Sequence, residues 1–480
     1  MKHARVMWVA TGMSVLFLLL TVTACRKNNP PVSQAINPTA AVTSVDERKQ
    51  QRYQWNLDTL VQPYEHAGYA NPEWDASAKL ALTEFARVRA NLANQDEPWL
   101  QIISTNVAAA VRSGCKDPMI NYLFIKFAMD ETNSKEAFSD AFVTMQRSMN
   151  TSVYPPVRKF YATVRTLDQL FATYGTNSLS IPAVLEMEAR LSQNFLPTIL
   201  DKKMPPDEAY EVCKEVLKEF NGDQKNYTQA YALMENITFQ NWPNDYTTWL
   251  LKGEAYIQLA WIARGGGYAY TVTEAGAKTF DADLAIADQA LTHAWELNPK
   301  DERIPFQMMT VELGQGQGRD RMELWFKRAM EIDPNDYDAC YKKMLYLEPK
   351  WYGSVDDMLE FGRFCVQNTN WGGRVPTVLV DAHLDIQQQF IDVSEQTNYW
   401  KNPEVWSDIQ SAYNRCFQID PDATDLYYYY ARFAYRAEDW SKLNELIPKL
   451  GSKNNYDFFG GKDEFDKMVQ LAKNHAGKPQ

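Results

Sequence analysis

The sequence predicts an all-α protein, an α-α superhelix of helical hairpins that is irregular in its N-terminal half. From about residue 45 onwards, apolar residues recur at i, i+3 and i+4, the spacing of amphipathic helices, and alternating strand-like runs are scarce. Proline and glycine fall mainly between these stretches. Three segments of the second half nearly superimpose on one another, which indicates internal repeats.

The first 24 residues have the three zones of a secretory signal peptide. They begin with Lys2 and Arg5, continue with an apolar stretch to residue 22, and end in the small residue Ala24 before Cys25. The last four residues of this run, Val-Thr-Ala-Cys, resemble the lipobox of bacterial lipoproteins, with valine where leucine is usual. The resemblance implies that Cys25 receives a diacylglycerol and becomes the new N-terminus. It predicts an exported protein held by lipid on a membrane of the cell envelope.

Two further points concern this anchor. An uncleaved signal anchor is the alternative, but residues 6–22 are at the short end of the roughly 17–25 residues of a spanning helix. In Gram-negative members of the lipoprotein family, aspartate after the cysteine favours retention in the inner membrane. Arg26 at that position therefore favours the outer membrane.

The chain after the signal divides into three parts. Residues 25–44 combine the acylated cysteine with a segment rich in Asn, Pro, Ser, Thr and Ala, which is too polar to fold and predicts a tether. Such a tether has a reach of roughly 25 Å. A helical N-terminal region follows at 45–240, and a repeat region at 241–480.

Charge and cysteine usage exclude several classes of function. Removing Lys2 and Arg5 takes the net charge from −12 to −14, and no Lys/Arg cluster stands out, so we expect no nucleic acid as partner. No second segment is long and apolar enough to span a membrane. The cysteines after Cys25 form no CxxC pair, which gives no support to a zinc or thioredoxin-like site. They are Cys115, Cys213, Cys340, Cys365 and Cys416.

The N-terminal region shows its helices through apolar periodicity. We expect helices over residues 78–92, 99–111, 120–129, 155–174, 181–196, 207–220 and 228–237. Asp117-Pro118, Pro155-Pro156 and Pro205-Pro206 are the expected helix boundaries.

The repeat region is defined by segments 290–299, 325–334 and 412–421. Each has a small residue that lets the second helix of a hairpin lie close to its neighbour: Ala294, Ala329 and Cys416. Each has a large residue three positions earlier to fill the adjoining groove: Leu291, Phe326 and Tyr413. Each closes on Asn or Asp and a proline, which ends the helix: Pro299, Pro334 and Pro421.

The first two of these prolines are 35 residues apart, near the period of about 34 in tetratricopeptide repeats. Trp249, Gly253 and Tyr256 match the first-helix pattern W-x2-L-G-x2-Y, with Lys252 where leucine is expected. Residues 246–450 thus resemble tetratricopeptide repeats, which implies a superhelix with a concave face for partners. A Gly- and Tyr-rich insertion at 265–270 and the segment 371–400 depart from the pattern.

Two other stretches resemble the uncharacterised domain-of-unknown-function family 4034. They are residues 114–118 with Tyr122, and residues 349–354 with Met358 and Phe361. The resemblance spans most of the folded chain but implies no activity. Both stretches are also explained as helix starts, with Ser354 as an N-cap.

A search for catalytic motifs finds no HExxH, P-loop, GxGxxG or GxSxG, so we expect no cofactor, no metal and no enzymatic activity. His383 lies near Asp381, but residues at i and i+2 do not share a helix face, which favours a structural histidine. Cys416 is interpreted as a small buried hydrophobe rather than a nucleophile. Cys340 and Cys365 would lie on the two helices of one hairpin, where a disulfide is an open alternative.

Most aromatic residues of the repeats should form core, and a few are candidates for a binding surface. These candidates are Tyr268, Tyr270, Trp351, Tyr352 and Trp371. The leading interpretation is a lipoprotein scaffold that holds an envelope protein or peptide in its helical-repeat groove. One alternative is a ligand- or glycan-binding lipoprotein of the nutrient-uptake type. The other is a hydrolase with an unrecognised site, in which His383 would meet a carboxylate from another helix.

Overall fold

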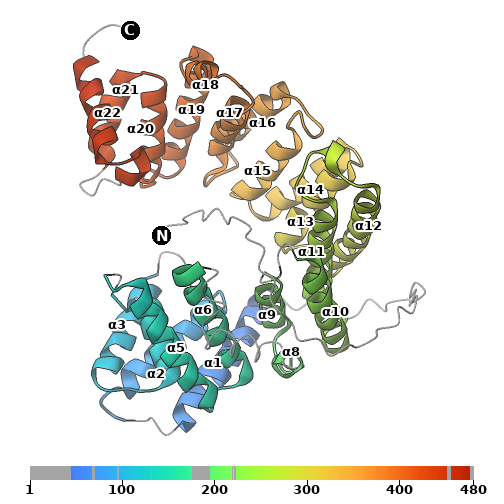
Figure 1. The fold of residues 1–480 in the computed structure, drawn as a ribbon, viewed down its shortest axis with the longest axis vertical. Helices are drawn as coiled ribbons and strands as arrows, with labels where there is room; N and C mark the ends of the chain where they lie inside the picture. The colour runs from blue at the N-terminus through green and yellow to red at the C-terminus, as the bar shows by residue number, and fades with distance from the viewer. Residues whose placement is uncertain are drawn as a thin grey trace. The chain divides into compact units, whose positions relative to one another are not determined.

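The computed structural model describes residues 45–67, 71–93, 97–130, 132–175, 195–218, 220, 223–450 and 456–475. Every regular element within these ranges is a helix, which confirms the all-α prediction (Figure 1). Cys25, the tether and most of the helix expected at 181–196 lie outside the described residues. None of the described helices has the length and apolar character needed to cross a bilayer.

The chain forms two compact units, residues 1–276 and 277–480. The division lies near the start of α12 (Glu274–Leu297), so the repeat region predicted from residue 241 begins within the first unit. Helix α11 (Tyr246–Arg264), which carries the W-x2-L-G-x2-Y pattern, therefore belongs to the first unit.

The first unit is a series of antiparallel neighbours followed by a smaller helical group. The series comprises α1 (Val45–His66), α2 (Asp75–Arg89), α3 (Trp99–Arg112), α4 (Pro118–Phe127), α5 (Lys135–Thr151) and α6 (Pro156–Tyr174). Each of these helices packs on the next. The short helix α8 (Phe195–Ile199) contacts α6, and α9 (Pro206–Lys218), α10 (Gln224–Asn241) and α11 pack on one another.

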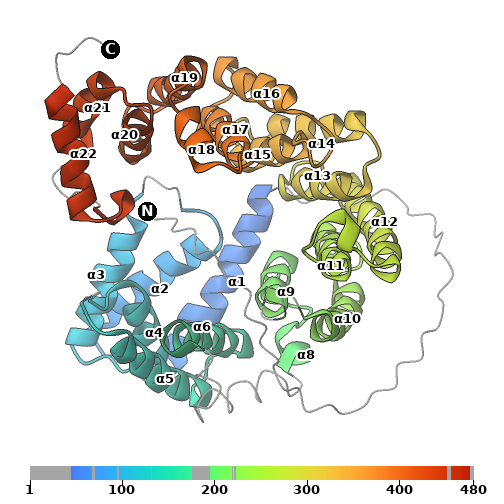
Figure 2. The ribbon, with the colours of Figure 1, turned by 45° about the horizontal axis from the view of Figure 1, so that its top comes forward.

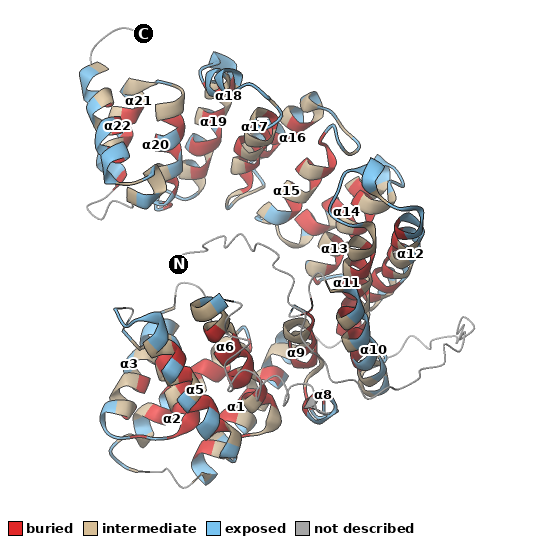
Figure 3. Ribbon diagram, in the orientation of Figure 1, coloured by how far each residue is buried: buried red, intermediate tan, exposed pale blue. Residues whose placement is uncertain are grey.

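An apolar cluster fills the centre of the series from α1 to α6. Leu60, Ile103, Ile120 and Met149 come from four of its helices and are fully buried. Figure 3 shows the buried positions along the helix faces that meet one another. The apolar residues at i, i+3 and i+4 thus form one face of each helix, and this face lies in the shared core as the sequence predicts.

The expected helix boundaries at proline are confirmed. Helices α4, α6 and α9 begin at Pro118, Pro156 and Pro206, where a missing backbone N–H costs no helical hydrogen bond. Asp117 caps α4 by accepting from the backbone N–H groups of Met119 and Ile120. Asp117 is itself buried, and burial raises the pKa of its carboxyl to about 6.

The second unit continues with helices that follow one another in chain order (Figure 2). They are α13 (Arg303–Gln315), α14 (Arg319–Ile332), α15 (Tyr337–Tyr346), α16 (Val355–Gln367), α17 (Val378–Gln387), α18 (Val393–Tyr399), α19 (Pro403–Ile419), α20 (Leu426–Arg436), α21 (Trp440–Leu446) and α22 (Lys462–His475). Ser354 caps α16 by accepting from the backbone N–H of Asp357 at 3.1 Å, as the sequence predicts.

Alternate helices of this unit form a layer. Helix α13 packs on α15, and α15 packs on α17, while α14 and α16 each pair with a member of the layer. Between α13 and α15, the Lys342 ammonium lies 4.9 Å from the centre of the Phe306 ring. Between α15 and α17, the Tyr337 hydroxyl donates to Asp381 at 2.6 Å. Hairpins stacked in this way are the arrangement of a helical solenoid.

Close helix approach depends on one glycine. A Cβ built on Gly362 of α16 would lie 2.9 Å from the Cα of Leu379 in α17, closer than real Cβ atoms approach. The two backbones therefore meet at this position without a side chain between them. The contact anchors α17, and with it the buried His383 that α17 carries.

Candidate functional site

The repeat-pattern residues lie at helix contacts. Ala294, Ala329 and Cys416 are buried, and the larger residues Phe326 and Tyr413 are buried beside them. The prolines of the pattern each stand two positions after the end of a helix: Pro299 after α12, Pro334 after α14 and Pro421 after α19.

The first-helix pattern lies on α11. Gly253 is buried, and the rings of Trp249 and Tyr256 meet Phe239 and Tyr231 of α10 edge to face, with centroids 4.9 and 5.8 Å apart. Lys252, the departure from the pattern, forms an ion pair with Glu235 of α10 at 2.8 Å. These contacts join α11 to α10.

The insertion places two tyrosines in solvent. It forms a loop with a short 3-10 turn (Ala269–Thr271) between α11 and α12. Tyr268 and Tyr270 are 73% and 85% exposed, and their rings stack with centroids 5.8 Å apart. Arg264 holds the loop by donating to the carbonyl oxygens of Gly265 and Gly267. The result is a small exposed aromatic platform.

The other aromatic candidates lie in the second unit and form two separate groups. Tyr352 donates its hydroxyl to the Leu313 carbonyl at 3.2 Å, and Trp351 tilts against its ring before the start of α16. Trp371 follows the end of α16, and its ring meets those of Phe326 and Phe364 edge to face. Helix α16 separates the two groups by a length of roughly 20 Å. The side chains of these residues mainly pack in contacts between helices.

The described cysteines are all buried, free thiols. Cys340 and Cys365 are therefore not joined by a disulfide in this structure, although the contact with Cys365, together with burial, raises the pKa of the Cys340 thiol. Burial raises the pKa of Cys416 to about 12, which leaves almost none of it as the nucleophilic thiolate.

His383 does meet a carboxylate from another helix. Its Nε2 lies 3.1 Å from Asp408 of α19, and its Nδ1 lies 2.7 Å from the Tyr399 hydroxyl. Asp408 also pairs with Arg363 at 2.8 Å. The ring is 1% exposed and both of its nitrogens are engaged, so no nitrogen faces a substrate. The arrangement ties α16, α17 and α19 together.

The structure shows a further site that the sequence did not indicate, built around the buried carboxylate of Glu208 on α9. One oxygen accepts from Arg89 of α2 at 2.7 Å and from the Tyr161 hydroxyl of α6 at 3.1 Å. The other accepts from Arg52 of α1 at 2.7 Å. Burial by itself would raise the pKa of Glu208, but Arg89, Arg52 and Arg158 lower it to about 2. Glu208 is therefore a carboxylate at neutral pH.

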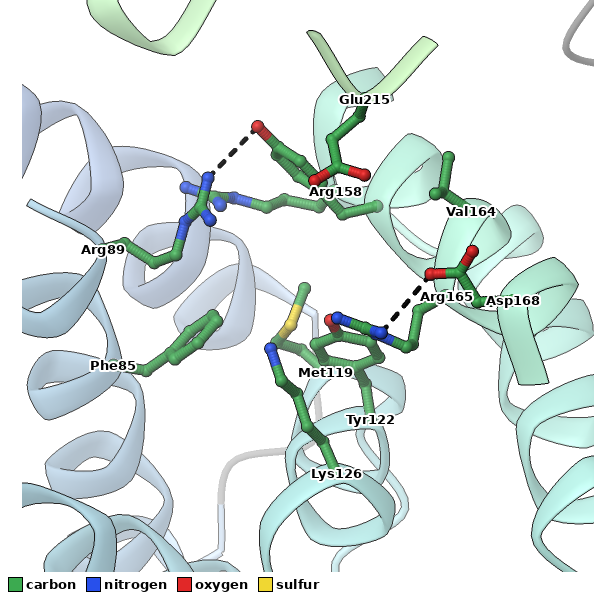
Figure 4. Close-up of a pocket in the computed structure, with 11 residues that line it drawn as sticks. Phe85, Arg89, Met119, Tyr122, Lys126, Arg158, Val164, Arg165, Asp168 and Glu215 are labelled. Carbon is green, nitrogen blue, oxygen red and sulfur yellow. Dashed lines mark hydrogen bonds and ion pairs between the residues drawn. The ribbon is translucent and has the colours of Figure 1, made fainter. Parts of the chain in front are cut away.

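A cavity of about 80 Å³ opens beside this cluster, between α2, α4, α6 and α9. Figure 4 shows Arg89 and Arg158 on one side of it and Lys126 on the other. Phe85 and Met119 add apolar surface. A water needs about 10–15 Å³ of such space, so the cavity has room for several waters or a small ligand.

The cations of this cavity differ in their partners. Arg158 is 2% exposed, and its Nη2 donates to the neutral groups Asn56 Oδ1 and Thr59 Oγ1 at 2.5 and 2.6 Å. Burial lowers its pKa to about 10. Lys126 lines the cavity with an exposed side chain, and partial loss of water together with Arg165 and Arg89 lowers its pKa to about 8. Arg89 pairs with Glu208 and Arg165 with Asp168, whereas Arg158 and Lys126 form no ion pair with any described residue.

The sequence holds one faint signal for this cavity. Arg158, Tyr161, Arg165 and Asp168 follow one another at i, i+3, i+7 and i+10, which places them on one face of α6. Such a polar stripe is also what a solvated helix face looks like. Only the packing of α2, α4 and α9 against this face of α6 shows that it is a cavity wall rather than a solvated face.

No protein-family model and no curated protein matches this sequence. Among the described residues, no group of His, Cys, Asp and Glu side chains is arranged to hold a metal ion.

Proposed function

We propose that this chain is a lipoprotein of the bacterial cell envelope, anchored through Cys25, whose stacked helices hold a protein or peptide partner. The observation that carries the proposal is the layer formed by α13, α15 and α17. Helices stacked in this way present a continuous row of side chains to a partner. The polar and aromatic members of the row, such as Tyr341 and Lys342, are partly exposed and suit a peptide with mixed chemistry.

The anchor is supported by the signal and lipobox residues of the sequence. A single diacylglycerol buries many methylene groups in the bilayer, each worth about 0.8 kcal/mol. The tether at 25–44 would leave the folded units free to meet partners at a distance from the membrane surface.

Replacing Cys25 by serine tests the anchor. We expect Cys25→Ser to abolish labelling with an alkyne fatty acid and to release the protein from the membrane fraction, because serine lacks the acylated thiol. Cys416→Ser is the matched control and should keep its label, since Cys416 is buried in a helix contact. Unchanged membrane retention of Cys25→Ser refutes the lipid anchor.

The layer is tested by crosslinking in cells. We expect a photoreactive phenylalanine analogue at Tyr341 of α15 to crosslink one discrete envelope protein, because this residue lies on the layer. The same analogue at Lys327 of α14, which is largely exposed outside the layer, should give no such product. Equal products from both positions, or none from either, would contradict the proposed groove.

A second candidate function, glycan or small-ligand binding, is favoured by the exposed platform of Tyr268 and Tyr270. Stacked aromatic rings in solvent offer an apolar face with a polar edge, which suits a sugar ring. The platform needs no contribution from the helical layer.

Glycan-array binding of the full mature chain tests this candidate. We expect Tyr270→Ala to lower the signal about tenfold, which corresponds to roughly 1.4 kcal/mol of lost contact. Tyr429→Ala removes a half-exposed tyrosine of the second unit and should leave binding unchanged. A glycan signal that Tyr270→Ala does not alter rules out the platform as the binding site.

A further inference from the structure

The cavity beside Glu208 carries more positive than negative charge. Its walls contribute four cations and two carboxylates, namely Arg89, Lys126, Arg158, Arg165, Asp168 and Glu215. Close by, Arg52 pairs with Glu208, so that these two charges offset each other. Farther out, Glu211 lies near Arg89 and Lys218 lies near Asp168. The negative charge of Glu211 and the positive charge of Lys218 offset each other. The local excess is two positive charges.

Two arginine nitrogens at the cavity lack acceptors, and a lysine there lacks an ion-pair partner among the described residues. The Nε atoms of Arg89 and Arg158 are buried and have no hydrogen-bond partner. Lys126 forms no ion pair with any described residue, and its ammonium stands 5.0 to 5.9 Å from the centres of the Phe127, Phe85 and Tyr122 rings. The two arginine Nε donors are buried, and a buried donor without an acceptor costs about 1–3 kcal/mol, and more when it is charged. The Lys126 ammonium is exposed and carries no such cost. A bound anion would remove the cost at the two arginines.

The remaining wall is apolar. Phe85 of α2, Met119 of α4 and Val164 of α6 are buried and face the same space. The Tyr122 ring, also buried, stands beside Met119 (Figure 4). A simple hydrated ion would gain nothing from these side chains. A ligand with an apolar group next to its charge would bury that group against them at about 25 cal/mol per Å².

We propose that this cavity binds a small organic phosphate monoester. Its phosphate would accept from Arg89, Arg158 and Lys126, and its organic group would lie against Phe85 and Met119. Three features select this class. The charge of about −1.5 to −2 on a phosphate monoester matches the excess of two cations. The planar guanidinium fork fits phosphate oxygens. The cavity volume of about 80 Å³ limits the organic group to a small one.

The site is independent of the proposed scaffold function. Every residue that forms it lies between Arg52 and Lys218 in the first unit, whereas the proposed partner layer lies in the second. Failure of the phosphate site would leave the scaffold proposal unaffected, and the reverse also holds.

Isothermal titration of the full mature chain tests the proposal with three probes: phenyl phosphate, inorganic phosphate and phenol. We expect phenyl phosphate to bind at least tenfold more tightly than inorganic phosphate, because only phenyl phosphate uses the apolar wall. Phenol should give no binding heat, because it carries no anion for the cations. Phenyl phosphate should also raise the melting temperature, since it binds the folded chain.

Lys126→Gln is the informative variant because Lys126 is exposed and is not a partner of Glu208, so that the substitution leaves the buried Glu208 cluster intact. Loss of one charge-assisted hydrogen bond should weaken phenyl phosphate binding about 10- to 100-fold. Lys135→Gln, at an exposed lysine of α5, is the matched control and should bind as the original chain does. A melting curve of each variant separates lost binding from lost folding.

Three results overturn the proposal. The first is no phenyl phosphate binding up to about 10 mM. The second is equal affinity of Lys126→Gln and Lys135→Gln. The third is inorganic phosphate binding as tightly as phenyl phosphate, which contradicts the role of the apolar wall.

Discussion

The buried carboxylate of Glu208 is the interaction on which the first unit depends. It joins Arg52 of α1, Arg89 of α2 and Tyr161 of α6 to α9, so that four helices meet at one side chain. A carboxylate with no solvent exposure is costly unless charge and hydrogen bonds compensate it. The two arginines supply that compensation, and the low pKa of Glu208 is the result. Beside Glu208, Asp207 of α9 pairs with Arg48 of α1 at 2.9 Å, but of the described residues only Glu208 joins α9 to α1, α2 and α6 through one side chain.

The same cluster explains the charge of the neighbouring cavity. Glu208 engages Arg52 and Arg89 directly, and Arg158 is left with the neutral partners Asn56 and Thr59. One carboxylate thus serves two paired cations while a third lies nearby without a pair. The cavity carries an excess of positive charge because the nearest buried carboxylate, Glu208, is already paired with Arg52 and Arg89.

The sequence predicted local structure well because local structure depends on neighbours in the chain. Asp117-Pro118 identified the start of α4, since both the cap and the proline act within one helical turn. The small and large residues of the repeated segments lie in helix contacts for the same reason, as Ala329 and Phe326 show. Rejecting Asp381 as the partner of His383 was also a local argument. Its actual partner, Asp408, comes from α19 and required the packing of distant helices.

The features that the sequence could not predict depend on packing between helices that are distant in the chain. Trp351 and Trp371 look alike in the sequence, yet the whole of α16 separates them, and both contact aromatic neighbours. Lys126, Arg158 and Arg89 come from three helices, and no spacing along the chain shows that they surround one space. By contrast, Tyr268 and Tyr270 could be recognised from the sequence as candidates for an exposed surface, because two tyrosines in a glycine-rich loop have no helix face to pack against.

The free energy of unfolding of Glu208→Gln tests this description of the first unit most directly. Glutamine keeps the shape but removes the charge, so Arg52 and Arg89 lose their counterion. We expect a loss of about 3 kcal/mol at neutral pH, from a pKa lowered by about two units or more and from the usual cost of breaking a buried pair. Because the folded pKa of Glu208 is the lower one, this contribution is complete above the unfolded pKa. It should fade as the pH falls from about 5 towards 2. Glu211→Gln on the same helix is the control and should change the free energy by less than about 0.5 kcal/mol. A Glu208→Gln chain as stable as the original at neutral pH would contradict the central role of this carboxylate.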